Sequence, residues 1–225
     1  MAKLIVHSGG AAATVDYISE SKGNARLPGI MTLGYISAFD DSLAMAVIVS
    51  KGIAPLKDAL QNEPEDHLKA AAAWSLGQIG RHAPDHAKYL AEADVPSRLL
   101  AVYMLPESSK DLKDKSKKAL KNVIQMCTHL PALEPLLQMA QNQKNILTYV
   151  CAQFAKVLPS NIDAKRTFVQ SGGFQKIQEI DAEPGSKLKE YIDEINSHYP
   201  QDIVNYYSPN YADKLLKRLD EYGAQ

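Results

Sequence analysis

A short apolar motif returns along this chain at intervals close to forty residues. The stretch Thr32-Leu33-Gly34-Tyr35-Ile36 aligns without a gap with Ser75-Leu76-Gly77-Gln78-Ile79. Similar apolar pairs, three residues apart, recur later in the chain. Their anchors are Leu33, Leu76, Leu120, Phe154 and Ile192, which are separated by 43, 44, 34 and 38 residues. Such a period, without strand-like alternation, predicts an array of stacked helical units rather than one spherical core.

The stretch 51–96 shows most clearly how one unit is built. Apolar residues from Ile53 to Leu60 have the spacing of a short amphipathic helix. A break at Pro64 precedes a longer helix from about Asp66 to Arg81, and Pro84 separates it from another short helix. Three helices per unit, the third longest, favour the armadillo class over two-helix HEAT repeats. We therefore expect an all-α, right-handed armadillo-repeat solenoid, an α-α superhelix.

The repeat divides the chain into about five armadillo units within residues 1–207. Their expected limits lie near 8–50, 51–93, 94–135, 136–170 and 171–207. Ser8-Gly9-Gly10 follows an apolar stretch in the same way as Ser171-Gly172-Gly173, which predicts that the first unit is truncated at its N-terminus. Residues 208–225 carry Leu215, Leu216 and Leu219 on one face. We expect this last segment to fold back as a C-terminal cap helix.

Composition excludes several kinds of partner. Lys and Arg number 25 against 26 Asp and Glu, which argues against a nucleic-acid partner and a polybasic membrane anchor. The longest apolar run, 43–49, is far shorter than the roughly twenty residues of a membrane-spanning helix. The two cysteines, Cys127 and Cys151, suit a reduced intracellular setting and are expected to be small core residues. The expected partners are therefore proteins.

The sequence contains no pattern typical of a catalytic or metal site. His82 and His86 are four residues apart, but Pro84 separates them and no glutamate follows in the arrangement of zinc proteases. The two Ser-Gly-Gly turns lack the Gly-Lys-Ser/Thr element of a phosphate loop. No nucleophile elbow is present. We expect no enzyme activity, no cofactor and no bound metal.

The third helices of an armadillo array line a concave groove, so their outward residues are candidates for partner binding. Register transfer places Met31, Trp74, Lys118, Ala152 and Glu190 in one ladder, and Tyr35, Gln78, Asn122, Lys156 and Glu194 in the next. Nuclear-import adaptors of this fold carry repeated Trp and Asn in these ladders. Only Trp74 and Asn122 match here, in different units, which weakens a cargo-receptor interpretation. A single tryptophan at helical spacing also fits ordinary packing.

Residues 110–121 contain six lysines and two aspartates in a chain that is otherwise nearly neutral. One interpretation is a solvated helix face, because exposed lysines are common. The other is an electrostatic footprint for an acidic partner. The candidate partner-binding residues are Trp74, Gln78, Lys113, Lys115, Lys117, Lys118, Lys121 and Asn122.

Several strings resemble the C-terminal half of the sperm-associated-antigen armadillo family of the ciliary central apparatus. They are AWSLGQIGRH at 73–82, KSKKALKN at 115–122, LPALEP at 130–135, SGG at 171–173, QEI at 178–180, AEPGS at 182–186 and YYSP at 206–209. The resemblance extends from about Gly52 onward and is weaker before it. These strings are much more specific than the repeat itself.

The resemblance implies a non-catalytic scaffold of the axonemal central pair that supports central-apparatus stability and the beating of cilia and flagella. It also implies a place in the cytoplasm and cytoskeleton, contact with a central-pair microtubule and other central-apparatus proteins, and self-association. No family motif assigns a binding residue. An alternative for the same fold is a cargo or adaptor protein, in nuclear transport or ubiquitin-related degradation, that binds peptides in its concave groove.

Overall fold

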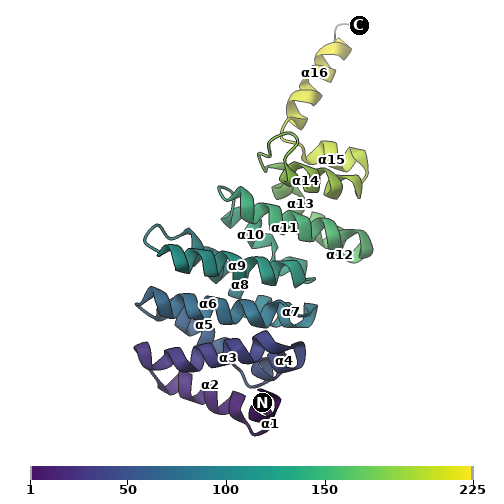
Figure 1. Cartoon of the computed structure of the whole chain (residues 1–225). Coiled ribbons are helices and arrows are strands. Elements are labelled where there is room, and N and C mark those ends of the chain that lie inside the picture. Colours follow the sequence, from purple (N-terminus) through teal and green to yellow (C-terminus); the bar gives the residue numbers. More distant parts are fainter. Residues whose placement is uncertain (1, 224–225) are drawn as a thin grey trace. The chain divides into compact units, whose positions relative to one another are not determined.

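The computed structural model describes residues 2–223 (Figure 1). Every regular element in that range is a helix, which confirms the expected all-α class. The chain forms two compact units, Met1–Met139 and Ala140–Gln225. The first contains α1 (Ala2–His7), α2 (Gly10–Glu20), η1 (Gly23–Arg26), α3 (Leu27–Phe39), α4 (Asp41–Val49), α5 (Ile53–Asn62), α6 (Asp66–Gly80), α7 (Pro84–Glu92), α8 (Val95–Met104), α9 (Lys110–Met126), η2 (Leu130–Ala132) and α10 (Glu134–Met139).

The first unit consists of helical layers that repeat in chain order. Helices α3, α6 and α9 lie side by side, with α6 in contact with both of the others (Figure 1). In addition, α2 packs against α3, α5 against α6 and α8 against α9, while α4 contacts α7. The triplets α4–α6 and α7–α9 each end in their longest helix, which agrees with the expected order of three helices per unit. These triplets begin at Asp41 and Pro84, ahead of the unit limits near 51 and 94 expected from the sequence. This is the three-helix repeat of an armadillo array.

The anchors identified by the sequence repeat are buried in the structure. Leu33, Leu76, Leu120 and Phe154 have no exposed surface and Ile192 is 4% exposed. Each lies on the third helix of a repeat, where neighbouring helices exclude water. Burial of such side chains is the main term that stabilises helical repeats. The register proposed from the sequence is confirmed at these positions.

Hydrogen bonds between successive repeats keep one offset along the first unit. Ser75 Oγ on α6 donates to the Ile30 carbonyl oxygen on α3 at 2.9 Å. His82 Nε2, just after α6, donates to the carbonyl oxygen of Ser37 at 2.6 Å. Asn122 Nδ2 on α9 donates to the Gly77 carbonyl oxygen on α6 at 3.2 Å. Each pair is 45 positions apart, so side chains of one repeat satisfy carbonyl groups of the one before.

In four of the repeats, a left-handed residue forms the turn from the first to the second helix. In two places it is glycine, at Gly9 and Gly172, with φ of 82° and 81°. The equivalence of the two Ser-Gly-Gly turns is thereby confirmed. At the corresponding turns before α5 and α8, the left-handed residues are Lys51 (φ 65°) and Asp94 (φ 59°), which lack the conformational freedom of glycine.

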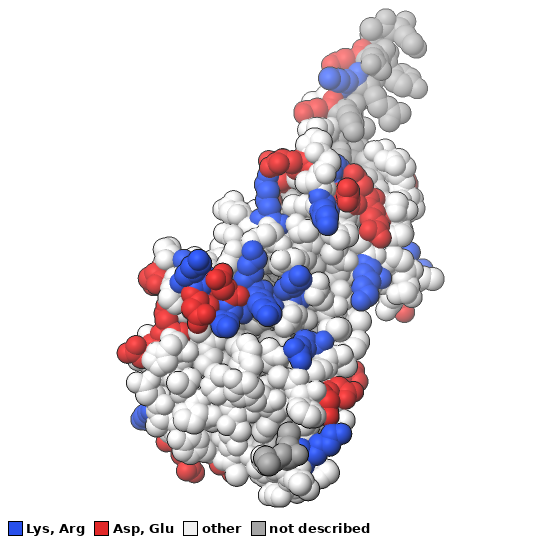
Figure 2. Space-filling view, viewed as in Figure 1, with Lys and Arg blue, Asp and Glu red and all other residues white. Residues whose placement is uncertain are grey.

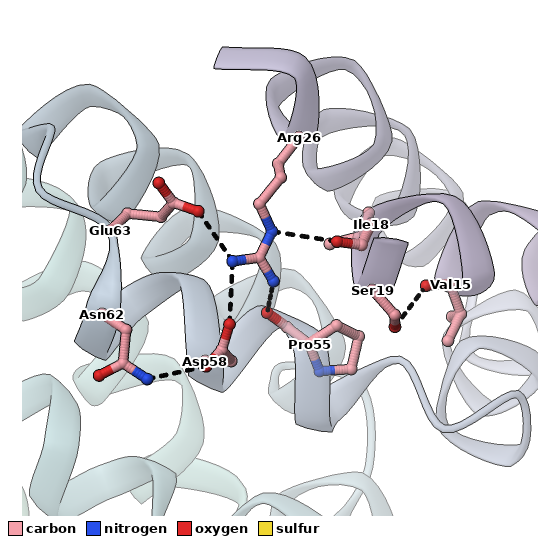
Figure 3. Close-up of polar contacts among 8 residues, drawn as sticks. All are labelled: Val15, Ile18, Ser19, Arg26, Pro55, Asp58, Asn62 and Glu63. Carbon is pink, nitrogen blue, oxygen red and sulfur yellow. Dashed lines mark hydrogen bonds and ion pairs between the residues drawn. The ribbon is translucent and has the colours of Figure 1, made fainter. Parts of the chain in front are cut away.

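A buried arginine ties η1 to α5 in the first unit (Figure 3). The side chain of Arg26 is 8% exposed, and its Nη1 atom lies 2.8 Å from a Glu63 carboxylate oxygen and 2.9 Å from an oxygen of Asp58. Its Nε and Nη2 atoms donate to the carbonyl oxygens of Ile18 and Pro55. The guanidinium is thus paired on all sides, as a buried charge requires.

The second unit contains α11 (Lys144–Val157), η3 (Leu158–Ser160), α12 (Ile162–Gln170), α13 (Gly173–Gln178), α14 (Lys187–Ser197), α15 (Gln201–Tyr207) and α16 (Tyr211–Gly223). Helices α11 and α14 pack against each other. An aromatic cluster forms much of the core: Phe154 stacks on Phe168 at 4.5 Å between ring centroids, and Phe174 contacts both Phe168 and Tyr199.

Helix α16 exists where the sequence places the cap helix, but its apolar face is open. Leu215 is 40% exposed and Leu216 is 59% exposed, whereas a helix folded back as a cap would bury them. The side chain of Leu219 and residues 224–225 lie outside the described part of the chain. The amphipathic pattern specifies the helix, but it does not specify which surface covers it.

A candidate partner-binding groove on the third helices

A groove of about 370 Å³ opens on the surface formed by α3, α6 and α9 in the first unit. Helix α3 contributes Tyr35 among others, α6 contributes Trp74, and α9 contributes Asp111 and Lys115. The lining residues are Leu27, Met31, Tyr35, His67, Ala70, Ala71, Trp74, Asp111 and Lys115. The small side chains of Ala70 and Ala71 on α6 leave room for the groove, while longer side chains on α3 and α9 form its walls.

Trp74 and Tyr35 form the aromatic part of this groove. Their ring centroids lie 5.0 Å apart at an interplanar angle of 66°, an edge-on contact between α6 and α3. Tyr35 is 64% exposed and Trp74 is half-buried. Exposed aromatic rings held by one another at a concave surface are typical anchors for a protein partner. The structure thus brings together Trp74 with Met31 of the same predicted ladder, and with Tyr35 of the next.

Two of the predicted site residues do not line the groove. Gln78 is only 6% exposed, so its amide is not available to a partner in this structure. Asn122 is half-buried and donates to the Gly77 carbonyl oxygen, which makes it a link between α9 and α6. Both residues lie on third helices, as the helical register predicts, but the close packing of α6 and α9 buries one and occupies the other.

All six lysines of 110–121 lie on α9, and one of them, Lys115, lines the groove. Figure 2 shows a cluster of Lys and Arg with a few acidic residues over α9, and a broad face with little charge over α3 and α6. Lys118 is exposed, and Lys115 and Lys117 are partly exposed. None of these three forms an ion pair with another described residue. Their charges are therefore available to a partner.

The start of α9 is held by hydrogen bonds to α6 and to the preceding loop. The Ser109 backbone N–H donates to a carboxylate oxygen of Asp66 at 2.6 Å, and this bond lowers the pKa of Asp66. Lys113 Nζ donates to the carbonyl oxygen of Pro106 at 3.0 Å, so this lysine of the candidate set supports the preceding loop. Lys121 also has an interaction within the structure. Lys115, which lines the groove, and its neighbours Lys117 and Lys118 remain the better candidates for binding.

The groove also contains residues that the candidate set omits. Asp111 lies one helical turn before Lys115, so it adds a negative charge to the same wall. His67 bonds to the side-chain oxygen of Asn24 at 2.7 Å, between α6 and η1. The sequence could have identified Tyr35 as a groove residue, because it lies in one of the two predicted ladders. Nothing in the sequence marks His67, because its place in the groove depends on the path of η1.

The two cysteines and the His82/His86 pair all have structural surroundings in the described part of the chain. Burial raises the pKa of the Cys151 thiol to about 12 and also raises the pKa of Cys127, so both cysteines stay protonated in the core, as expected. His82 and His86 each bond to a backbone carbonyl group. Among residues 2–223, no cluster of His, Cys, Asp and Glu could hold a metal ion. No described helix is both long enough and apolar enough to cross a membrane.

Comparison with known proteins finds relatives of high sequence identity in two mammals. Over 167 residues, or 74% of the chain, it is 59% identical to sperm-associated antigen 6 of Mus musculus, and equally to that of Homo sapiens. The chain spans about a third of the length of these relatives, 32%. No family model matches it.

Solved structures with a similar fold are armadillo-repeat proteins. A designed armadillo repeat protein in complex with the peptide (KR)4 matches 88% of this chain and 85% of its own, with a TM-score of 0.58 and 14% identity. Computationally designed armadillo repeat proteins for modular peptide recognition give a TM-score of 0.59 at 14% identity, over 88% of this chain and 86% of theirs. At such low identity the likeness concerns the fold. The chain is therefore an armadillo-repeat protein, and the resemblance of its sequence to the sperm-associated-antigen proteins is confirmed.

Proposed function

We propose that this protein is a non-catalytic interaction scaffold of the axonemal central pair, which supports central-apparatus stability and the motility of cilia and flagella. The observation that carries the proposal is the 59% identity to sperm-associated antigen 6 over 74% of the chain. The repeat fold supports it, because stacked helices offer extended surfaces to other proteins. The buried cysteines and the carbonyl-bonded His82 and His86 support a non-catalytic role.

The groove on α3, α6 and α9 is the part of the first unit that we assign to partner binding. Lys115, Lys117 and Lys118 attract an acidic surface, such as that of a central-pair microtubule or of another central-apparatus protein. Trp74 and Tyr35 then supply apolar contact once the partner has docked. Lysines act as separate point charges and impose little geometry, which suits a repetitive acidic surface. Screening over about 8 Å at physiological salt makes this attraction sensitive to ionic strength.

Localisation tests the proposed place of the protein. The chain, fused to a small tag, is expressed in cells that build motile cilia, and its position in the axoneme is determined by expansion or electron microscopy. We expect label along the central pair. Label confined to the nucleus would favour the cargo or adaptor alternative, and diffuse label throughout the cell would contradict a structural role in the axoneme.

Co-sedimentation with microtubules tests the proposed binding surface. In the test variant, Lys115, Lys117 and Lys118 are all replaced by Glu. A matched control replaces the exposed Lys22, Lys51 and Lys187 by Glu, which gives the same change in net charge at other sites. We expect the test variant to lose most binding at low salt and the control to retain it. Equal binding by the two folded variants would show that the α9 lysines are only a solvated helix face.

Tyr35→Ala tests the aromatic contribution to binding separately from the contribution of the lysines. Because Tyr35 is 64% exposed, its removal should change stability little while it removes one wall of the groove. We expect microtubule binding to weaken by about tenfold, with its salt dependence unchanged, since an aromatic anchor contributes on the order of 1–2 kcal/mol. Unchanged binding by Tyr35→Ala would place the contact surface outside this groove.

A further inference from the structure

The second unit has a groove of its own, separate from the α3–α6–α9 groove. A hollow of about 340 Å³ lies between α12 and the segment that leads from α14 into α15. Helix α12 contributes Ile162, Lys165, Arg166 and Val169, and the facing segment contributes Tyr199 and Ile203. We refer to it as the α12–α15 groove. Neither the lysines of α9 nor the repeat motif pointed to it.

The floor of the α12–α15 groove is held in place by Tyr199. Its ring contacts Phe174 in the core at 4.4 Å between centroids, and its hydroxyl donates to the carbonyl oxygen of Lys165 at 3.3 Å. Burial raises the pKa of this hydroxyl to about 12, so it remains a donor. The hydrogen bond links the two walls of the groove, and the aromatic contact anchors Tyr199 to α13 in the core.

The walls of the groove expose aliphatic surface. Ile162, the first residue of α12, is 69% exposed, and Val169 and Ile203 are partly exposed. An isolated exposed isoleucine is ordinary, but aliphatic side chains from two elements that line one hollow form a site for an apolar side chain. Burial of one such side chain is worth about 1.5–3 kcal/mol.

The charged side chains that line this hollow are all positive. Lys165 and Arg166 line it, and no acidic side chain does. Neither cation forms an ion pair with a described residue. An acidic residue of α12 itself, Asp163, is exposed but does not line the groove. A carboxylate placed beside the aliphatic walls would meet two unpaired cations, one of them a guanidinium suited to bidentate pairing.

A histidine in the groove lacks the hydrogen bond made by its counterpart in the first unit. His198 occupies the position of His82 in the repeat, and His82 Nε2 bonds to the Ser37 carbonyl oxygen at 2.6 Å. The Nε2 atom of His198, in contrast, is buried and has no partner among the described residues. Buried polar atoms are normally satisfied, so the unsatisfied nitrogen of this lining residue is an exception in the second unit.

We propose that the α12–α15 groove binds an acidic segment of a partner protein that inserts an aliphatic side chain. The inserted side chain packs against Ile162, Val169 and Ile203, and flanking carboxylates pair with Lys165 and Arg166. This site is independent of the proposed role in the central pair. Charge complementarity identifies the occupant, because an apolar segment flanked by lysines would meet like charges.

Fluorescence anisotropy with designed peptides tests the proposal on the full chain. The probe is a labelled peptide with two central leucines between glutamates. One control peptide replaces the glutamates by lysines, and another replaces the leucines by serines. We expect the acidic leucine peptide to bind at least about tenfold more tightly than either control, with an affinity that falls as salt rises. Equal binding of the acidic and basic peptides would overturn the assignment.

Variants of the protein test whether the peptide binds in the α12–α15 groove. Ile162→Ser removes an exposed side chain and should leave the fold intact, and K165E/R166E reverses the local charge. The control Lys187→Glu changes an exposed lysine of α14 that does not line the groove. We expect each of the first two changes to weaken binding of the acidic peptide by about tenfold or more. The Lys187→Glu control should bind this peptide as tightly as the wild type does. If all three bind alike, the peptide does not use this groove.

The same variants distinguish a partner protein from a second copy of this chain. Light scattering is measured for the wild type and for Ile162→Ser at the concentration of the peptide experiment. A monomeric wild type supports a partner that is a different protein. A wild-type dimer that dissociates on Ile162→Ser would overturn that identification, since the groove would then be filled by another copy.

Discussion

Gly77 on α6 lies so close to Ala119 on α9 that a Cβ atom at Gly77 would be 2.7 Å from the Cα of Ala119. Gly34, the matching residue of the preceding repeat, has the same role, because a Cβ there would collide with Trp74 and Ser75 of α6. The glycine shared by the two copies of the motif therefore sets the distance between successive third helices. It also positions the aromatic ring of Trp74 in the groove.

Gly77→Ala should reduce the free energy of unfolding by about 1–3 kcal/mol. The new methyl group meets backbone rather than a flexible side chain, so α6 and α9 must separate to accommodate it. Urea denaturation measures the change. Gln125→Ala, which alters an exposed residue of α9, is the matched control and should remain within about 0.5 kcal/mol of the wild type. A variant as stable as the control would mean that the helices are less closely packed than described.

The close approach of these helices could be predicted from the sequence because it depends on residue size at a repeated position. Leu33 and Leu76 identify the buried side of the helix, and the glycine that follows each marks the contact with the next helix. The directions of Gln78 and Asn122 could not be predicted in this way. A helical register fixes the position of a Cα atom, whereas neighbouring carbonyl groups and available space decide where an amide points. Gln78 is consequently buried, and Asn122 bonds to Gly77.

Lys51→Gly should stabilise the protein by up to about 1 kcal/mol. Lys51 has φ of 65°, a conformation that costs a non-glycine residue on the order of 1–2 kcal/mol, and the greater backbone entropy of unfolded glycine offsets part of the gain. The change gives this turn the Ser-Gly-Gly sequence found before α2 and α13. Thermal denaturation should show a higher melting temperature. Lys51→Ala, which keeps the strain, should not.

The left-handed conformations of Lys51 and Asp94 are another feature that could not be predicted from the sequence. Glycine at Gly9 and Gly172 indicates a left-handed turn directly, because glycine adopts positive φ without strain. The same turn before α5 is formed by a lysine, which has no such preference, and before α8 by an aspartate, whose preference is weaker than that of glycine. The helices on both sides impose this conformation through their packing, and a single sequence does not report that constraint.

Arg26→Met should destabilise the first unit by about 3–5 kcal/mol, because it leaves the carboxylate of Glu63 buried without its cation. Asp58→Asn is the contrasting change. The Asp58 side chain is 50% exposed, so its ion pair with Arg26 is screened by water, and its loss should cost about 1 kcal/mol or less. The double variant R26M/E63Q should recover part of the stability lost in Arg26→Met. No recovery in urea denaturation would show that the arginine acts through its bonds to Ile18 and Pro55.

The stability of the first unit should decrease as the pH falls below about 6.5, and His86 is one cause. This residue of α7 is 3% exposed, its Nδ1 atom is buried without a described partner, and burial lowers its pKa. The nearby groups are His82, which disfavours a second positive charge, and Asp41 and Asp85, which favour it. Between the lowered pKa of the folded state and about 6.5, the unfolded chain binds the proton more readily, so acid favours unfolding.

The measurement for His86 is the urea midpoint from about pH 7.5 to about pH 5.5. His86→Gln replaces the histidine with a neutral polar side chain, so it should lower stability at neutral pH but make it depend less on pH. His7→Gln, a change at an exposed histidine, should leave the pH dependence of the wild type intact. If the His86→Gln variant and the wild type lose stability in parallel as the pH falls, the proton that destabilises the fold is bound elsewhere.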